Sequence, residues 1–146
     1  LDSDLLEVVY ALCRAADDRK ADDIVALYTA PVTTLSSVLI LVSGKSPPQN
    51  AAIAASVRET AEDDDNFHLQ LGGGNGVPEG QATSGWIVLD YGSIIVHVMT
   101  PKSRLFYNVE GHWRQKGATS INVEHVLAGS PVAEVEESEQ DDPFWS

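Results

Sequence analysis

A short segment near the middle of the chain carries most of the side chains that could do chemistry. The segment GWIVLDYGSIIVHVM, residues 85–99, contains a Trp, an Asp and a His. An Asp close to a His suits general acid–base catalysis, whereas a Trp among polar side chains is typical of protein interfaces. We therefore ask whether Trp86, Asp90 and His97 belong to a catalytic site or to a surface that binds another protein.

This segment predicts a β-hairpin with Tyr91-Gly92 as a two-residue loop. In that register Trp86 lies opposite His97, and paired residues share one face of the sheet. One face is wholly aliphatic and belongs to the core: Ile87, Leu89, Ile94, Val96 and Val98. The other face is mixed: Trp86, Val88, Asp90, Ser93, Ile95, His97 and Met99. The mixed face suits either a protein interface or a second core layer with His97 hydrogen-bonded inside.

Other groupings lack the spacing that catalysis or metal binding needs. Gly44-Lys45-Ser46 resembles the end of a phosphate-binding loop, but Leu39 stands where that motif needs a glycine. The histidines, at positions 68, 97, 112 and 125, have no metal-ligand spacing. Asp22-Asp23 and residues 63–65 place carboxylates in polar turns, where solvated charge is the default. We predict no catalytic residue, no metal site and no cofactor.

Length and composition favour one soluble domain. The chain has 146 residues, of which 43% are hydrophobic, so a substantial core is expected. No apolar run approaches the roughly 20 residues of a membrane-spanning helix. The single cysteine, Cys13, excludes an internal disulfide and lies in a helical apolar pattern, which predicts a small buried hydrophobe.

The charge balance is strongly acidic. The formal net charge is −13, which argues against direct nucleic-acid binding and favours a basic partner. Part of this charge is local, because AEVEESEQDD at residues 133–142 contributes six acidic residues. We predict one domain over residues 1–127, followed by an acidic, flexible tail over residues 128–146.

Apolar periodicity predicts alternating helices and strands in the first half of the chain. A helix is expected over Asp4–Ala16, with Asp4 and Glu7 spaced as a capping box, and buried strands over Ile24–Tyr28 and Val38–Gly44. A second helix is expected over Pro47–Glu62, with Ser46 as its N-cap, Pro47 at its first position and Gln49 completing a capping box.

The second half of the chain is expected to complete a mixed sheet. An edge strand over Phe67–Leu71 and a flexible loop over residues 72–85 precede the hairpin. Ser103 is expected to cap a helix that runs to Trp113, and INVEHVL, residues 121–127, adds a strand or a helical turn. The fold class is α/β, a mixed β-sheet flanked by helices.

Five pieces of the chain, in order, resemble the ribosomal silencing factor family, also called Iojap or RsfS. The first is the Asp-x-Lys-Ala-x-Asp-Ile pattern at residues 18–24, and the second is Ser-Gly-x-Ser at residues 43–46. Gln49 with Ala-Ile-Ala at residues 52–54 follows. The last two are the hairpin at residues 86–98 and Arg-x-Phe-Tyr…Trp at residues 104–113.

The resemblance implies a fold similar to nucleotidyltransferases without the catalytic acids, and a function other than catalysis. Family members bind the large-subunit ribosomal protein numbered fourteen and sterically block association with the small subunit, which damps translation. The resemblance implies partner-binding roles for Trp86 and Tyr91 as aromatic anchors and for Asp90 and His97 as polar partners. Arg104 and Tyr107 contact the partner or support the last helix.

The chain departs from the family pattern at three places. Ser36-Ser37-Val38-Leu39 replaces a Thr-Asp-Tyr-Phe sequence, Pro47-Pro48 replaces Asp-Arg, and Ser93 replaces an acid. The phrases EGQATSGW and FYNVEGHW look most similar to the plastid and cyanobacterial branch, and the chain begins with Leu. We therefore favour a chloroplast protein, with a bacterial-type cytoplasm or the mitochondrion as alternatives.

Two other functions stay open at this stage. One is an acidic adaptor domain for another protein partner. The other is a nucleotidyltransferase-like enzyme, which would need paired metal-binding acids after the Gly44 turn, where Pro47-Pro48 stands instead. Homodimerisation through the mixed face is compatible with each of these functions.

Overall fold

Five strands form one mixed sheet in the spatial order β3-β4-β2-β1-β5. The computed structural model describes residues 1–63, 76–80 and 84–128. The strand bounds are Asp22–Tyr28 (β1), Val38–Ser43 (β2), Trp86–Asp90 (β3), Ile94–Met99 (β4) and Thr119–Ile121 (β5). Neighbouring strands are antiparallel except for β2 and β4, which run parallel.

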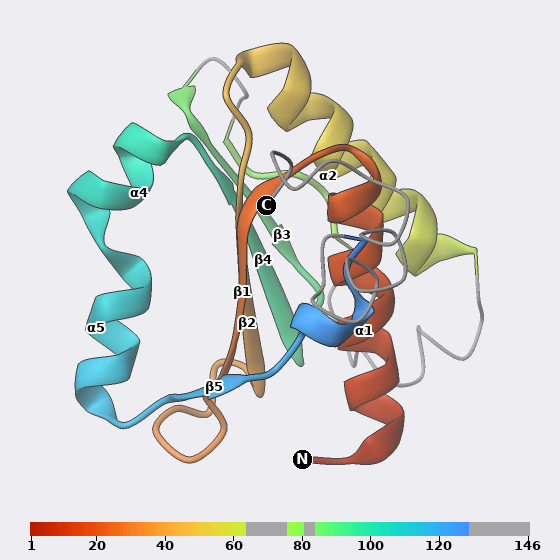
Figure 1. Ribbon diagram of the computed structural model, residues 1–146. Coiled ribbons are helices and arrows are strands. Elements are labelled where there is room, and N and C mark those ends of the chain that lie inside the picture. Colours follow the sequence, from red (N-terminus) through yellow and green to blue (C-terminus); the bar gives the residue numbers. More distant parts are fainter. Residues whose placement is uncertain (64–75, 81–83, 129–146) are drawn as a thin grey trace, which may run out of the picture.

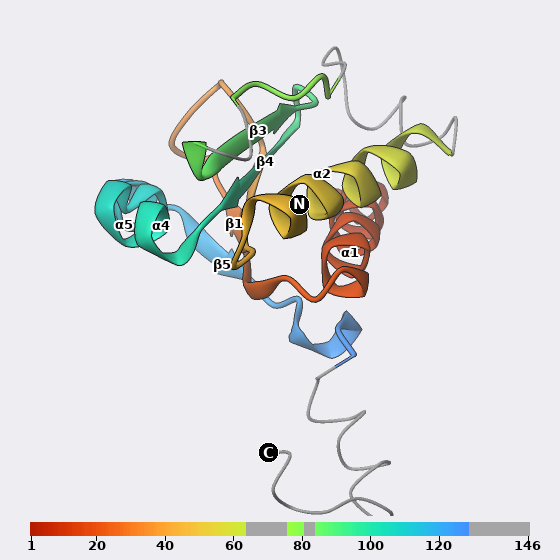
Figure 2. The ribbon, with the colours of Figure 1, turned by 90° about the horizontal axis from the view of Figure 1, so that it is seen from above.

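Helices lie on both sides of this sheet (Figure 1). The long helices α1 (Ser3–Asp18) and α2 (Pro47–Glu62) cover one face, and the short helices α4 (Pro101–Tyr107) and α5 (Val109–Lys116) lie over the other. Figure 2, which looks along the layers from above, shows the same separation. The predicted α/β class, a mixed sheet flanked by helices, is confirmed.

The central strand β2 is buried on both faces, as its continuous apolar run predicted. Val38, Ile40 and Val42 face α1 and α2 in the larger of two hydrophobic clusters. Leu39 and Leu41 join Leu27, Met99 and Ala118 in a smaller cluster on the opposite face, where Trp113 and Val109 of α5 cover it.

Local side-chain bonds define where the two long helices begin. The N-cap of α1 is Asp2, whose carboxylate accepts from the Asp4 backbone N–H, so the cap lies two residues before the predicted one. Ser46 caps α2 as predicted, with its hydroxyl accepting from the Gln49 N–H. The Gln49 side chain accepts from the backbone of Lys45 and donates to Lys20, which ties α2 to the end of α1.

Cys13 is fully buried in α1, which confirms that it packs as a small hydrophobe. Burial raises the pKa of its thiol to about 12, because a thiolate loses its hydration there. The thiol is therefore protonated and unreactive at physiological pH.

The predicted register of the hairpin is wrong by two positions. Asp90 pairs with Ile95 and Trp86 with Met99, because Gly92-Ser93 rather than Tyr91-Gly92 forms the loop. Gly92 adopts a φ of +83°, which glycine tolerates without strain. Since side chains alternate with a period of two, the shift leaves every strand residue on its predicted face.

The corrected register moves Tyr91 onto the core face of the sheet. Its backbone N–H donates to Ile94, and only 3% of the residue is exposed. The ring packs against Gly76, where an added Cβ would clash with the ring carbons. Burial raises the pKa of the phenol to about 12. Tyr91 therefore supports the hairpin from inside, which contradicts the expected surface anchor.

The helix predicted from Ser103 to Trp113 is two helices. Thr100 caps α4 by accepting from the Ser103 N–H, with Pro101 at the first position, so the helix begins before the predicted cap. Asn108, at φ 46° and ψ 50°, ends α4 in the left-handed conformation and turns the chain into α5. The region predicted as a strand or helical turn holds both, since β5 is followed by the 3-10 helix η2 (Glu124–Val126).

Some predicted segments lie outside the described residues. These are the edge strand at 67–71, much of the loop at 72–85, and the acidic tail after residue 128. Of the loop, residues 76–79 run along β3, with Glu79 paired to Val88. In the described part of the chain, no helix has the length and apolarity to cross a membrane.

Two substitutions at Tyr91 test its place in the core. Among the described residues, its hydroxyl has no hydrogen-bond partner, so Tyr91→Phe should change the free energy of unfolding by less than about 1 kcal/mol. Tyr91→Ala should lower it by about 3–5 kcal/mol, because a ring-sized cavity remains. Urea denaturation measures both. Equal, small effects of the two substitutions would contradict the buried position.

Candidate protein-docking surface

Aromatic side chains from β3 and α4 gather on the side of the sheet that α4 and α5 flank. The Trp86 ring lies 4.8 Å from the Tyr107 ring, and the Phe106 ring meets Tyr107 edge-on at 4.9 Å, both measured between centroids. We call Trp86, Phe106 and Tyr107 the aromatic patch. It joins residues about twenty positions apart in the sequence, and it presents rings of the kind that anchor protein interfaces.

His97 holds Trp86 in place from the neighbouring strand. The Trp86 indole Nε1–H donates to His97 Nδ1 over 2.9 Å, and the ring centroids are 5.7 Å apart. Nδ1 can accept this bond only when it carries no proton, so the imidazole is neutral with its proton on Nε2. Burial lowers the pKa of His97 to about 4, which keeps it neutral at physiological pH.

The apolar side chains of α4 point into solvent. Leu105 is 84% exposed, Phe106 79% and Tyr107 54%. Leu105 and Phe106 were not among the residues predicted to bind a partner, although three consecutive large apolar residues in so short a helix cannot all face the core. Together with Lys102 and Ser103 they line a shallow hollow of about 460 Å³ beside the patch.

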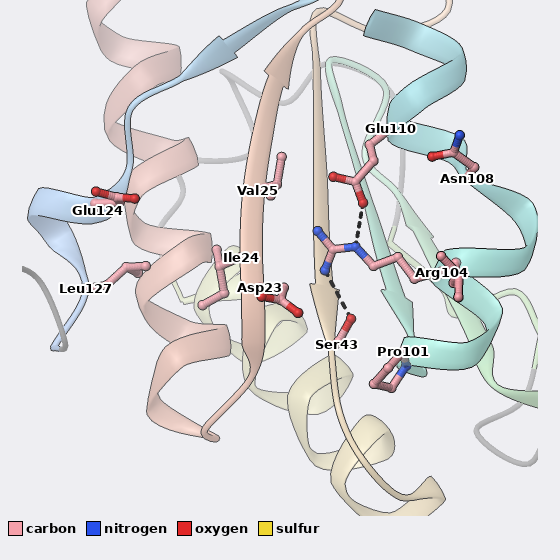
Figure 3. A pocket seen from close by; sticks show the side chains of 11 residues that line it. Asp23, Ile24, Val25, Ser43, Pro101, Arg104, Asn108, Glu110, Glu124 and Leu127 are labelled. Atoms are coloured by element: carbon pink, nitrogen blue, oxygen red, sulfur yellow. Dashed lines mark hydrogen bonds and ion pairs between the residues drawn. The ribbon is translucent and has the colours of Figure 1, made fainter. Parts of the chain in front are cut away.

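Arg104 fixes the helix that carries the patch. Its guanidinium is buried, with Nε donating to Glu110 of α5 at 2.7 Å and Nη1 donating to Ser43 of β2 at 3.0 Å (Figure 3). These charge-assisted bonds join α4 to α5 and to the end of the central strand. The alternative of structural support therefore describes Arg104 better than direct contact with a partner.

A cavity of about 610 Å³ lies between this anchor and β1. Asp23, Glu110 and Glu124 contribute carboxylates to its wall, and Arg104 contributes a cation (Figure 3). Asp23 sits at a β-bulge with φ +50°, where the β1 register shifts against β2. Within the described residues, no group of three or more His, Cys, Asp or Glu side chains is placed to hold a metal ion.

The predicted binding residues fall into two groups. Trp86, His97 and Tyr107 come together at the patch, whereas Asp90 lies at the far end of β3, about 13 Å away at the usual rise per residue. The exposed Asp90 carboxylate accepts from the Gly92 N–H over 2.8 Å, so it closes the hairpin turn. Tyr91 lies on the opposite, core face.

The bond between Trp86 and His97 predicts a specific pH dependence of stability. The pKa of His97 falls from 6.5 in the unfolded chain to about 4 in the fold, so the unfolded state binds the proton first. The free energy of unfolding therefore keeps its full contribution from neutral His97 above pH 6.5, and this contribution is lost as the pH falls toward 4. We expect the titration of His97 to lower the free energy of unfolding by about 2 kcal/mol between pH 7 and pH 5.

His97→Gln is the matched variant for this measurement, because an amide oxygen can still accept from the indole but does not titrate. Chemical denaturation at pH 7, 6 and 5 should show a steeper decline for the wild type than for the variant. Other titrating groups cancel in the difference between the two proteins. Parallel pH profiles would show that His97 is not held neutral by the fold.

Comparison with known proteins places these features in a family. The profile of the family described as "Ribosomal silencing factor during starvation", RsfS, matches residues 2–144. The ribosomal silencing factor RsfS of Halalkalibacterium halodurans is 27% identical over 122 residues, which cover 84% of this chain and 97% of the relative. The chloroplastic protein Iojap of Arabidopsis thaliana is 30% identical over 109 residues, which cover 75% of this chain and 42% of that longer protein.

Solved structures agree with this relationship. A crystal structure of a protein from Chromobacterium violaceum superposes with a TM-score of 0.64 at 29% identity, covering 78% of this chain and 88% of that one. A Bacillus halodurans crystal structure gives a TM-score of 0.61 at 26% identity, covering 83% and 99%. The chain therefore belongs to the ribosomal silencing factor family, RsfS.

Proposed function

We propose that this protein binds the large ribosomal subunit through ribosomal protein fourteen and sterically blocks association with the small subunit. The observation that carries the proposal is the aromatic patch, in which Phe106 and Tyr107 are exposed and Trp86 is half-buried, in a chain of the ribosomal silencing factor family. Membership supports a role at the ribosome, and the patch supplies a surface through which the protein can dock.

The geometry of the patch suits protein recognition. Two of its rings lie on a helix that the buried Arg104 pair holds in place, so little backbone freedom is lost when they are covered. Half-buried Val88, Ile95 and His97 continue the same face of the sheet beyond Trp86. An interface of standard size, about 800 Å² on each partner, can be built from this face together with α4.

The roles of the predicted binding residues divide accordingly. In this proposal Trp86 and Tyr107 contact the partner and His97 orients Trp86. Arg104 positions α4, and Asp90 and Tyr91 shape the hairpin. Phe106 and Leu105 are additional contacts, because a larger fraction of each is exposed than of Trp86 or Tyr107. The strong acidity of the chain fits a basic ribosomal protein as the partner.

The proposal also includes the cellular compartment in which the protein acts. Relatives include chloroplastic Iojap proteins, a mitochondrial Iojap-related protein and bacterial silencing factors. We favour the chloroplast, on the similarity to the plastid branch at residues 79–86 and 106–113. Ribosomes isolated from chloroplasts, mitochondria and bacteria offer a direct comparison, and preferential binding to the first would support this assignment.

The main test is co-sedimentation with isolated large and small ribosomal subunits. Binding to the large subunit alone, together with a fall in subunit joining, is the expected result. Binding to neither subunit would reject the proposal and favour the alternative of an acidic adaptor for another protein. Sedimentation velocity of the free protein tests for a homodimer, which the aromatic patch could also support.

Substitutions in the patch should weaken binding selectively. Phe106→Ala and Tyr107→Ala should each reduce affinity for the large subunit by about 30-fold or more, as expected for an anchor residue. Trp86→Ala should have a similar effect and should restore subunit joining. Leu35→Ala is the matched control, because Leu35 is also an exposed large apolar residue, 73% exposed, in the turn between β1 and β2. Equal effects of Leu35→Ala and Phe106→Ala would contradict the assignment.

A further inference from the structure

The positive charge of this acidic chain is concentrated in one layer. Residues 101–117, which form α4 and α5, contain four of the nine Lys and Arg residues and one of the 22 Asp and Glu residues. Their formal charge is +3 in a chain of −13. On the opposite side of the sheet, residues 1–21, which include α1, contain five Asp and Glu and three Lys and Arg, so the two helix layers differ in sign (Figure 1).

Three of the four cations in the α4–α5 layer are open to solvent. Lys102, Arg114 and Lys116 are exposed, whereas Arg104 is buried in its pair with Glu110. Arg114 is 45% exposed and is held by Glu110 at 3.5 Å and by the Ser120 hydroxyl at 3.3 Å. Lys116 Nζ lies 5.6 Å from the centre of the Trp113 ring, and Lys102 makes no ion pair within the described residues.

This basic layer is continuous with the aromatic patch. Lys102 lines the same hollow as Leu105, Phe106 and Tyr107, and α5 extends from the end of the helix that carries those rings. A partner protein seated on the patch therefore brings its immediate surroundings against α5. On a ribosomal subunit, those surroundings include the RNA to which the partner is bound.

We propose that Lys102, Arg114 and Lys116 contact the phosphate backbone of large-subunit RNA next to the docked protein. This inference rests on the proposed function and adds a second class of contact to the same binding event. Lys and Arg side chains bind phosphates without reading sequence, and such contacts fix the orientation of a bound protein. The acidic α1–α2 layer is then turned away from the RNA, which orients the domain on the subunit.

Salt dependence distinguishes this contact from a purely protein interface. Each phosphate contact releases condensed counterions, so the slope of log affinity against log salt should steepen by about one for each contact. Binding to the whole large subunit should therefore weaken more steeply with salt than binding to isolated ribosomal protein fourteen. Free single-stranded RNA should bind weakly by comparison, because the chain as a whole is acidic.

Two charge-matched triple variants provide the test. The first is Lys102→Gln with Arg114→Gln and Lys116→Gln. The control is Arg14→Gln with Arg19→Gln and Lys20→Gln, three exposed cations of the acidic layer. Both remove three positive charges, so a long-range effect of net charge alone would act equally on them. Circular dichroism and urea denaturation establish that both variants fold.

The first triple should weaken binding to the large subunit by about tenfold near 0.1 M salt and flatten the salt slope by two to three. It should leave binding to isolated protein fourteen unchanged, and the control triple should bind the subunit like the wild type. An equal loss of affinity in both triple variants would overturn the phosphate contact. So would an equal loss of affinity for isolated protein fourteen and for the subunit, which would indicate that the three cations contact an acidic protein surface instead. Failure of the wild type to bind either target would instead reject the proposed function itself.

Discussion

The parallel pairing of β2 with β4 is the constraint on which the rest of the structure depends. Because the strands run the same way, Ser43 and Met99 end together at one edge of the sheet. The chain leaves β4 there, Thr100 caps α4, and the first turn of that helix brings Arg104 to the Ser43 hydroxyl. One strand pairing therefore decides where α4 stands, and the position of α4 decides that its rings face solvent beside Trp86.

Much of this fold could be predicted from residue patterns, because side chains alternate between the two faces of a strand. A register error of two residues therefore leaves each side chain on its predicted face. The hairpin loop lies one residue later than predicted, which shifts the pairing by two and leaves Ile87 and Leu89 facing the core. The Ser46 cap and the buried run of β2 are likewise local signals that the tertiary structure keeps. Tyr91 was misplaced for the same reason, since a residue at the boundary between strand and loop changes role when the loop moves by one position.

The candidate docking surface was less predictable, because it depends on contacts between distant residues. Nothing local to Arg104 indicates that its partners are Ser43, 61 positions earlier, and Glu110. Once that pair is buried, the neighbouring side chains of α4 must point away from the sheet, and the exposure of Leu105 and Phe106 follows. The left-handed Asn108 was equally hidden, since asparagine occurs in helices as well as at their ends. It separates one expected helix into two that meet the sheet independently.

Net charge is a poor guide to how such a domain meets a ribosome. The helix layers on the two faces of the sheet are about 20 Å apart, since each helix axis lies about 10 Å from the sheet. Screening at physiological salt has a length of about 8 Å, so a phosphate beside α5 is influenced far more by Arg114 and Lys116 than by the acids of α1. The net charge of −13 on the whole chain and the charge of +3 on the α4–α5 layer therefore act at different distances. In the complex proposed above, the first limits non-specific binding to RNA, and the second selects the orientation in which the proposed phosphate contact forms.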